Sequence, residues 1–368
     1  MDFPKVVIHE ECMREGMQIE SAEISIDDKV RLLDALSRTG LTSINVGSFV
    51  SPRYTPQMAR MEELLERFSP VEGVRYYYLA FNRQGHERAA RFVPPLSAPG
   101  GEFALICHLC DTFARRNMNM SQAQEIERWP TIVDAARAAG ATEAAIGVGA
   151  AWGSNFTGLA TLEDRLEMLR RAHGLWDDAG VAVTKVVFAD PMSWCMPHRV
   201  EETLEAVQAE WPAISTYHLH LHDARGMALP SIYAALRALD PSRTVSLDLT
   251  AGGIGGCPYC GNGRATGMAA TEDVVVMLEE MGMPTGVDVD RLIDFVWMLE
   301  DVLGRLTPGH VSKAGPLPRG DALYDPNLPF IETHEEARHF RLGPEVAAHQ
   351  VYPWKEPIPA PDLHAPAS

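Results

Sequence analysis

The sequence has few cysteines, no long apolar run and no excess of positive charge. Six cysteines are spread over 368 residues, which argues against the disulfide scaffold of a small secreted protein. No apolar stretch approaches the roughly 20 residues that cross a bilayer. Strand-like residues begin at Val6, with no basic and apolar leader before them. We therefore expect a cytoplasmic protein with no membrane partner.

The charge balance narrows the choice of partners. The formal net charge is -18, so a nucleic-acid backbone would be repelled over most of the surface. We expect no nucleic-acid partner, although a local cluster of Arg and Lys could still bind an anionic small molecule. Hydrophobic residues make up 46% and charged residues 22% of the chain, which is typical of a soluble globular protein.

Short apolar strand patterns alternate with amphipathic helical patterns about eight times. Serial strand–helix units with apolar strands predict a parallel sheet covered by helices, and eight such units favour a closed (β/α)₈ TIM barrel over an open sheet. The expected strands are Val6–Glu10, Ser43–Gly47, Arg75–Ala80, Phe103–His108, Ala144–Val148, Lys185–Ala189, Thr216–Leu221 and Val245–Leu249.

Helical patterns lie between these strands, and several end at a glycine, as helices often do. The expected helices are Asp27–Thr39, Ser121–Ala139, Leu162–Ala179, Arg199–Glu210 and Pro230–Leu239. We expect residues 1–285 to form the catalytic barrel and residues 286–306 to add a helix packed on it. Residues 307–368, rich in Pro and His, are expected to form a C-terminal extension, an extended arm or tail.

Polar and metal-capable residues follow the expected strands, at the barrel end where such folds carry their chemistry. His220 and His222 flank one residue on a strand, so both imidazoles point the same way and suit a divalent ion. The alternative is that one or both only hydrogen-bond in the core. His218 extends the alternation and Asp223 follows, which favours the metal site; His218 is expected deeper in the barrel, outside the ligand set.

Arg14-Glu15 follows the first strand. The carboxylate could bind the metal while the guanidinium stabilises a developing enolate, or the two could form an ordinary surface ion pair. Cys257-Pro258-Tyr259-Cys260 is similar to a redox dithiol, but it lies late in the chain rather than early in a thioredoxin-like unit. A zinc site with Cys107 and Cys110 on a predicted strand is a further alternative. A single thiol that donates a proton fits the glycine-rich loop better.

With these residues placed, the chain resembles 3-hydroxy-3-methylglutaryl-CoA lyase and its metal-dependent TIM-barrel relatives. The resemblance runs from about Val6 to Thr285. The segments that carry it, in chain order, are Arg14-Glu15-Gly16-Met17-Gln18, Gly47-Ser48-Phe49-Val50-Ser51-Pro52, Arg115-Arg116-Asn117-Met118-Asn119, His220-Leu221-His222-Asp223, Gly253-Ile254-Gly255-Gly256-Cys257-Pro258-Tyr259 and Ala270-Thr271-Glu272-Asp273.

The resemblance implies retro-Claisen cleavage of an acyl-CoA or hydroxy-acid substrate with a divalent ion. It favours Mg²⁺ or Mn²⁺ and leaves Co²⁺ and Zn²⁺ open. The implied metal ligands are Glu15, His220 and His222. Arg14 would stabilise the enolate, Cys257 would protonate it, and Asp190 would orient or deprotonate the substrate hydroxyl.

The chain also departs from this family. Glu15 stands where the lyases carry Asp, Asn45 where they carry a Glu on strand two, and Met268 where they carry a metal-binding Asn. Asn262 could replace that asparagine as a ligand, but we do not favour this assignment. These departures put the substrate in doubt and keep two other functions open: a Claisen-type synthase that condenses an acyl-CoA with a 2-oxo acid, and a catalytically altered binding protein. We expect a homodimer.

Overall fold

The computed structural model describes residues 2–98, 102–260 and 267–323. The chain divides into two compact units, Met1–Lys313 and Ala314–Ser368. The first unit contains every strand expected from the sequence and all the residues of the candidate site. The second unit is described as far as residue 323 and contains the 3₁₀ helix η6 (Gly320–Ala322).

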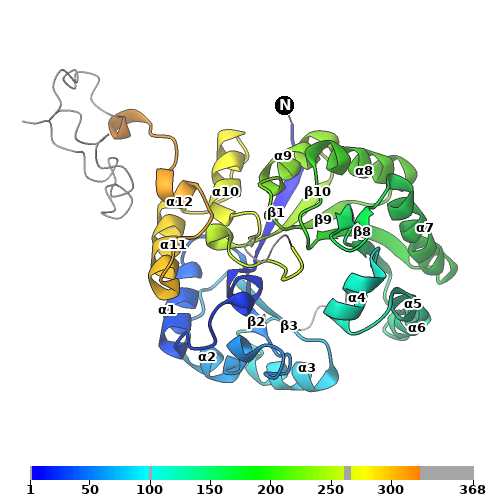
Figure 1. Ribbon diagram of the computed structural model, residues 1–368, viewed down its shortest axis with the longest axis horizontal. Helices are drawn as coiled ribbons and strands as arrows, with labels where there is room; N and C mark the ends of the chain where they lie inside the picture. The colour runs from blue at the N-terminus through cyan, green and yellow to red at the C-terminus, as the bar shows by residue number, and fades with distance from the viewer. Residues whose placement is uncertain (1, 99–101, 261–266, 324–368) are drawn as a thin grey trace, which may run out of the picture. The chain divides into compact units, whose positions relative to one another are not determined.

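Eight parallel strands form one sheet in the first unit, and all eight coincide with the predicted strands to within a few residues (Figure 1). The order of neighbouring strands is β3-β2-β1-β10-β9-β8-β5-β4. Their bounds are β1 Lys5–Glu10, β2 Ser43–Ser48, β3 Arg75–Leu79, β4 Phe103–His108, β5 Glu143–Gly149, β8 Ala182–Asp190, β9 Thr216–Leu221 and β10 Thr244–Leu249.

The curled sheet has the strand succession of a (β/α)₈ barrel, with an open seam. β3 and β4 lie at the two ends of the order, and no ladder joins them within the described residues. Ile106, in the middle of β4, is 38% exposed, as expected of a residue on an edge strand. The expected barrel is confirmed, and its hydrogen-bonded wall is a sheet open between β3 and β4.

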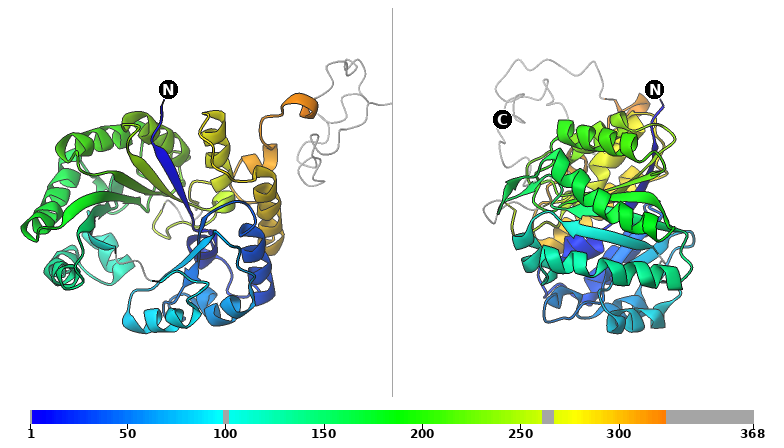
Figure 2. Two further views of the ribbon diagram at one scale, coloured as in Figure 1. Left: turned by 180° about the vertical axis from the view of Figure 1, so that it is seen from behind. Right: turned by 90° about the vertical axis from the view of Figure 1, so that its right-hand side faces the viewer.

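The helices follow the strands along the chain, as the views from behind and from the side make clear (Figure 2). The predicted run Ser121–Ala139 is two helices, because Arg128 ends the first and Pro130, which lacks an N–H, begins the second. The helices are α1 Ile26–Leu36, α2 Met61–Arg67, α3 Arg83–Ala89, α4 Asp111–Met118, α5 Gln122–Glu127, α6 Trp129–Ala138, α7 Leu162–Asp178, α8 Pro197–Glu210, α9 Ala228–Ala238, α10 Thr271–Glu280, α11 Val289–Leu303 and α12 Val311–Ala314. None of the described helices is long and apolar enough to cross a membrane.

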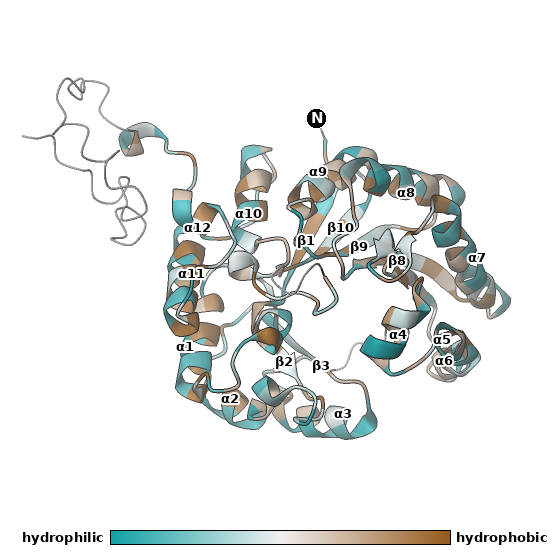
Figure 3. Ribbon diagram, in the orientation of Figure 1, coloured by the Kyte–Doolittle hydropathy of each residue, from teal (hydrophilic) through white to brown (hydrophobic). Residues whose placement is uncertain are grey.

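The hydrophobic core lies between the sheet and the helices, which carry hydrophilic and hydrophobic residues on different faces (Figure 3). Trp152, Trp176 and Phe188 are fully buried in its larger part. Trp152 donates its indole N–H to Thr203 Oγ1 at 3.2 Å. This tryptophan is therefore a packing residue.

The side chains that face the inside of the sheet are polar and hydrogen-bond across strands. His9 Nε2 and His218 Nδ1 both contact Ser246 Oγ at 2.9 Å. His218 Nε2 lies 3.1 Å from Asp248 Oδ2. These contacts place His218 below the candidate ligands, as the sequence predicted, and they lead from the barrel interior to the carboxyl ends of the strands.

Candidate metal centre

The first part of the site is a π-helical turn, η1 (Cys12–Gly16), directly after β1. Such turns are rare and concentrate at functional sites. The buried carboxyl group of Glu10 holds this one, because Glu10 Oε1 accepts the backbone N–H of Cys12 at 2.8 Å and that of Ala251 at 3.0 Å. The turn places Arg14 and Glu15 side by side at the carboxyl end of the sheet.

The second part comes from β9, where His220 and His222 point the same way. Their Nε2 atoms lie 3.2 Å apart, and His222 Nε2 lies 3.8 Å from Glu15 Oε1. One ligand atom from each of the three residues fits within a distance of 4.8 Å from the others. The structure thus brings together all three ligands that the sequence suggested, and it gives no other such group among the described residues.

The imidazole of His220 is oriented as metal ligands usually are, whereas that of His222 has no partner on its second ring nitrogen among the described residues. His220 Nδ1 donates to Asp248 Oδ2 at 2.9 Å, which orients the ring and directs Nε2 into the site. Burial lowers the pKa of His222 to about 3, so this ring is neutral, as a ligand must be. His222 Nδ1 is buried and has no hydrogen-bond partner in the described part of the chain. Two imidazoles and one carboxylate are a donor set that fits a divalent ion.

Asp248, on β10, is a site residue that sequence reasoning missed. Burial by itself raises its pKa, but His218 and His220 outweigh burial and hold the pKa well below its ordinary value. Asp248 therefore stays ionised and supports the ring of His220. The alternation of Ser246 and Asp248 within an otherwise apolar strand was the available signal.

The guanidinium of Arg14 lies between two carboxylates. Arg14 Nη1 donates to Glu15 Oε2, and Arg14 Nε donates to Glu11 Oε2 at 2.6 Å. Burial opposes ionisation of Glu15, yet Arg14 and His222 lower its pKa below the ordinary value. Glu15 is thus an ionised carboxylate with one oxygen on Arg14 and the other toward His222.

Glu11 is a second residue that sequence reasoning missed. Its side chain is buried and accepts from Asn45 Nδ2 at 3.2 Å to Oε1 and 3.1 Å to Oε2. The hydroxyl of Tyr77 donates to Glu11 Oε1 at 2.6 Å. Two successive glutamates at the end of the first strand were the only sequence signal.

Cys257 lies in the loop that follows β10 and is 7% exposed. Burial raises the pKa of its thiol to about 11, so the thiol is protonated near neutral pH and can donate a proton. It packs with Cys110, Met192 and Cys260 in a small apolar cluster. Gly255 permits the close approach of this loop to the metal-binding turn: its φ is +102°, and an added Cβ would lie 3.2 Å from Glu15 O.

Asp190 is fully buried at the end of β8. Its Oδ1 accepts the backbone N–H of Trp194 at 3.0 Å, and its Oδ2 accepts that of Cys195 at 2.7 Å. Burial raises its pKa. These bonds hold the loop after β8, and a role toward the substrate hydroxyl stays a prediction.

The remaining candidates are placed as follows. Met268 forms an isolated antiparallel backbone bridge with His222, so it lies next to one of the candidate ligands. Asn262 lies outside the described residues. Cys110 follows β4 and accepts the N–H of Phe113 as the cap of α4, rather than lying on the strand. The described cysteines are all free and form no metal-ligand group.

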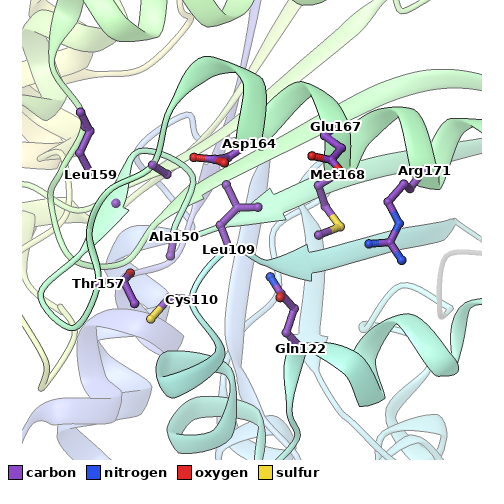
Figure 4. A pocket seen from close by; sticks show the side chains of 12 residues that line it. Leu109, Cys110, Gln122, Ala150, Thr157, Leu159, Asp164, Glu167, Met168 and Arg171 are labelled. Atoms are coloured by element: carbon purple, nitrogen blue, oxygen red, sulfur yellow. The ribbon is translucent and has the colours of Figure 1, made fainter.

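A polar cavity of about 350 Å³ is lined by none of the candidate ligands. Figure 4 shows Asp164, Glu167 and Arg171 of α7 on one side and Gln122 on another. The cavity lies between α7 and the segments that follow β4 and β5. The chemistry therefore belongs to the buried carboxyl ends of β1 and β9, and this cavity is separate from it.

The chain is similar to known proteins over most of its length. The HMGL-like family model matches residues 5–298. The mitochondrial hydroxymethylglutaryl-CoA lyase of Gallus gallus is 32% identical over 313 residues, 85% of this chain and 98% of that protein. A 3-hydroxy-3-isohexenylglutaryl-CoA/hydroxymethylglutaryl-CoA lyase of Pseudomonas aeruginosa is also 32% identical, over 85% and 98% of the two chains.

Solved structures give the same result. The HMG-CoA lyase of Bacillus subtilis superposes with a TM-score of 0.69 at 29% identity, over 85% of this chain and 99% of that one. A lyase of Acinetobacter baumannii, solved in complex with coenzyme A and 3-methylmalate, has a TM-score of 0.68 at 29% identity, over 87% and 97%. With the family model matched over most of its length, the chain belongs to the HMGL-like family.

Proposed function

We propose that this protein is a divalent-metal-dependent carbon–carbon lyase that cleaves a 3-hydroxy-3-methylglutaryl-CoA-like substrate. One observation carries the proposal: the ligand atoms of Glu15, His220 and His222 converge within 4.8 Å at the carboxyl ends of the strands. Family membership supports the same reaction class, because the curated relatives are hydroxymethylglutaryl-CoA lyases.

These three residues would hold the metal ion. Mg²⁺ or Mn²⁺ is the ion we propose first, and the two imidazoles also suit Co²⁺ and Zn²⁺. When bound, such an ion polarises the oxygens of the substrate and favours loss of the hydroxyl proton. Asp248 fixes the ring of His220 for this purpose through a hydrogen bond of 2.9 Å.

The chain's own residues account for the rest of the reaction. Breaking the carbon–carbon bond leaves an electron pair on the departing acyl group as an enolate, and the fixed guanidinium of Arg14 stabilises its negative oxygen. Cys257 then supplies the proton that the enolate carbon needs, because burial keeps its thiol protonated. Asp190 is proposed to orient or deprotonate the substrate hydroxyl.

The substrate is proposed to be a CoA thioester with a 3-hydroxy-3-carboxyalkyl chain. A structural neighbour was solved with coenzyme A and 3-methylmalate, and the relative from Pseudomonas aeruginosa carries two acyl substrates in its name, one with an isohexenyl substituent. The departures at Glu15, Asn45 and Met268 favour an acyl substituent other than methyl. The cytoplasmic location and the homodimer stay predictions.

The test is release of acetyl-CoA. Purified protein is incubated with Mg²⁺ or Mn²⁺ and a set of 3-hydroxyglutaryl-CoA thioesters that differ in the second substituent on C3, and acetyl-CoA is measured by mass spectrometry. We expect cleavage of at least one thioester, abolished by chelation and by Arg14→Gln. Net condensation of acetyl-CoA with a 2-oxo acid would support the synthase instead. Metal binding without any conversion would support the binding protein.

A further inference from the structure

Glu11 holds a central place in the site, although the reaction proposed above uses none of its atoms. Its carboxylate lies at the end of β1, is buried, and contacts three polar side chains. Besides the Arg14 Nε bond, Arg14 Nη2 lies 2.5 Å from Glu11 Oε2. Asn45 on β2 and Tyr77 on β3 donate to the same carboxylate. Three neighbouring segments, η1, β2 and β3, therefore converge on one side chain.

We propose that Glu11 is a positioning residue for catalysis. The proposal rests on the function proposed above and deepens it. Glu11 fixes the guanidinium of Arg14 and divides its donors between two carboxylates. In consequence, Glu15 keeps one oxygen available for the metal ion.

The division of the donors is visible atom by atom. Arg14 presents Nε and Nη2 to Glu11 and only Nη1 to Glu15. Glu15 therefore uses Oε2 for Arg14, while its Oε1 lies 3.8 Å from His222 Nε2. Without Glu11, two buried guanidinium donors would lose their acceptor. The other carboxylate that contacts Arg14 is that of Glu15. The guanidinium would then compete with the metal ion for both oxygens of Glu15.

Asn45 and Tyr77 show that the surroundings are adapted to a carboxylate at position 11. Asn45 donates its amide to both oxygens of Glu11, and its own Oδ1 accepts the N–H of Gly47 at 3.2 Å. A glutamate at position 45 would instead bring a second negative charge against Glu11, and two buried carboxylates repel one another. The amide on β2 and the carboxylate on β1 therefore form a matched pair.

The experiment exchanges these residues. The central comparison is among the wild type, Glu11→Gln, Asn45→Glu, and the double variant Glu11→Gln/Asn45→Glu. Each is titrated with Mn²⁺ by calorimetry, assayed for cleavage, and melted thermally. Glu125→Gln is the matched control, since Glu125 is another buried carboxylate and pairs with His108 at 2.7 Å.

We expect Glu11→Gln to melt like Glu125→Gln but to bind Mn²⁺ about tenfold more weakly, within the range for residues that orient ligands. Its kcat should fall by more than its KM rises. Asn45→Glu alone should lose more affinity than Glu11→Gln, and the double variant should regain most of it. Tyr77→Phe, which removes one donor and no charge, should lie between wild type and Glu11→Gln, and it serves as the test if Glu11→Gln fails to fold.

Two results would overturn the inference. The first is a Glu11→Gln variant with the Mn²⁺ affinity and the kcat of the wild type, or a Tyr77→Phe variant with both if it has to replace Glu11→Gln. The second is a double variant that binds Mn²⁺ no more tightly than Asn45→Glu alone. Failure of the proposed function looks different, because the wild type itself would then bind Mn²⁺ without cleaving any thioester. In that case the Mn²⁺ affinities alone still decide whether Glu11 positions the site.

Discussion

Replacing Asp248 with Asn should weaken metal binding more than any other change outside the ligands. Asp248 Oδ2 accepts from His220 Nδ1 at 2.9 Å and from His218 Nε2 at 3.1 Å. The asparagine side chain has the same shape and keeps one acceptor oxygen, but it has no charge. It therefore no longer favours the form of His220 that carries its proton on Nδ1 and its lone pair on Nε2. Losing such a partner typically costs about 10–100-fold in metal affinity, or about 1.4–2.8 kcal/mol. We expect the upper half of this range, because charge and orientation are lost together.

The assay is a calorimetric titration of the metal-free protein with Mn²⁺, with thermal melting as a check on folding. His218→Gln is the control: it removes the other bond to Asp248 Oδ2 and leaves the His220 bond in place, so its affinity should stay within about threefold of wild type. The reasoning is refuted if Asp248→Asn binds Mn²⁺ within about twofold of wild type, or if His218→Gln loses as much.

Three further predictions follow from single contacts. Cys257→Ser should lower turnover about 10²–10⁴-fold while Mn²⁺ affinity is unchanged, because a hydroxyl is a weaker acid than the thiol; full turnover would remove Cys257 as the proton donor. Gly255→Ala should lower the free energy of unfolding by about 1–3 kcal/mol in urea titrations, because the φ of Gly255 is +102° and an added Cβ would lie 3.2 Å from Glu15 O. The control is Gly174→Ala, in a helix with open space around it, which should instead raise the free energy of unfolding. Burial raises the pKa of Glu10 from 4.5 to about 8, so the contribution of Glu10 to stability is lost as the pH rises from about 4.5 to about 8. In urea titrations over this pH range, the free energy of unfolding should therefore decline less in Glu10→Gln than in the wild type.

The fold could be predicted because it depends on local patterns. The strands of the barrel are short runs that alternate or combine apolar residues, and α7 or α9 shows its amphipathic face over several turns. The patterns fail where the segments are short. The two-residue strands β6 (Gly153–Ser154) and β7 (Gly158–Leu159) and the four-residue helix α12 carry too few residues to show a period.

The candidate ligands could be predicted because each was signalled along the chain, by the spacing of His220 and His222 and by the Arg14-Glu15 pair after a strand. Glu11 and Asp248 could not be assigned in the same way. Their roles depend on the register between strands, since Asp248 stands opposite His220 in the β9–β10 pairing. Asn45 was recognised as a departure from the family, but only the fold places a carboxylate from the neighbouring strand against it.

The most direct test of a catalytic centre built on Glu15, His220 and His222 is the metal content of the purified protein. Mass spectrometry would count the ions per chain, and titration of the metal-free form with Mg²⁺, Mn²⁺, Co²⁺ and Zn²⁺ would rank them. We predict one ion per chain, lost in Glu15→Ala and in His220→Ala. A protein that binds none of these ions, or whose alanine variants bind them as tightly as the wild type, would contradict the account.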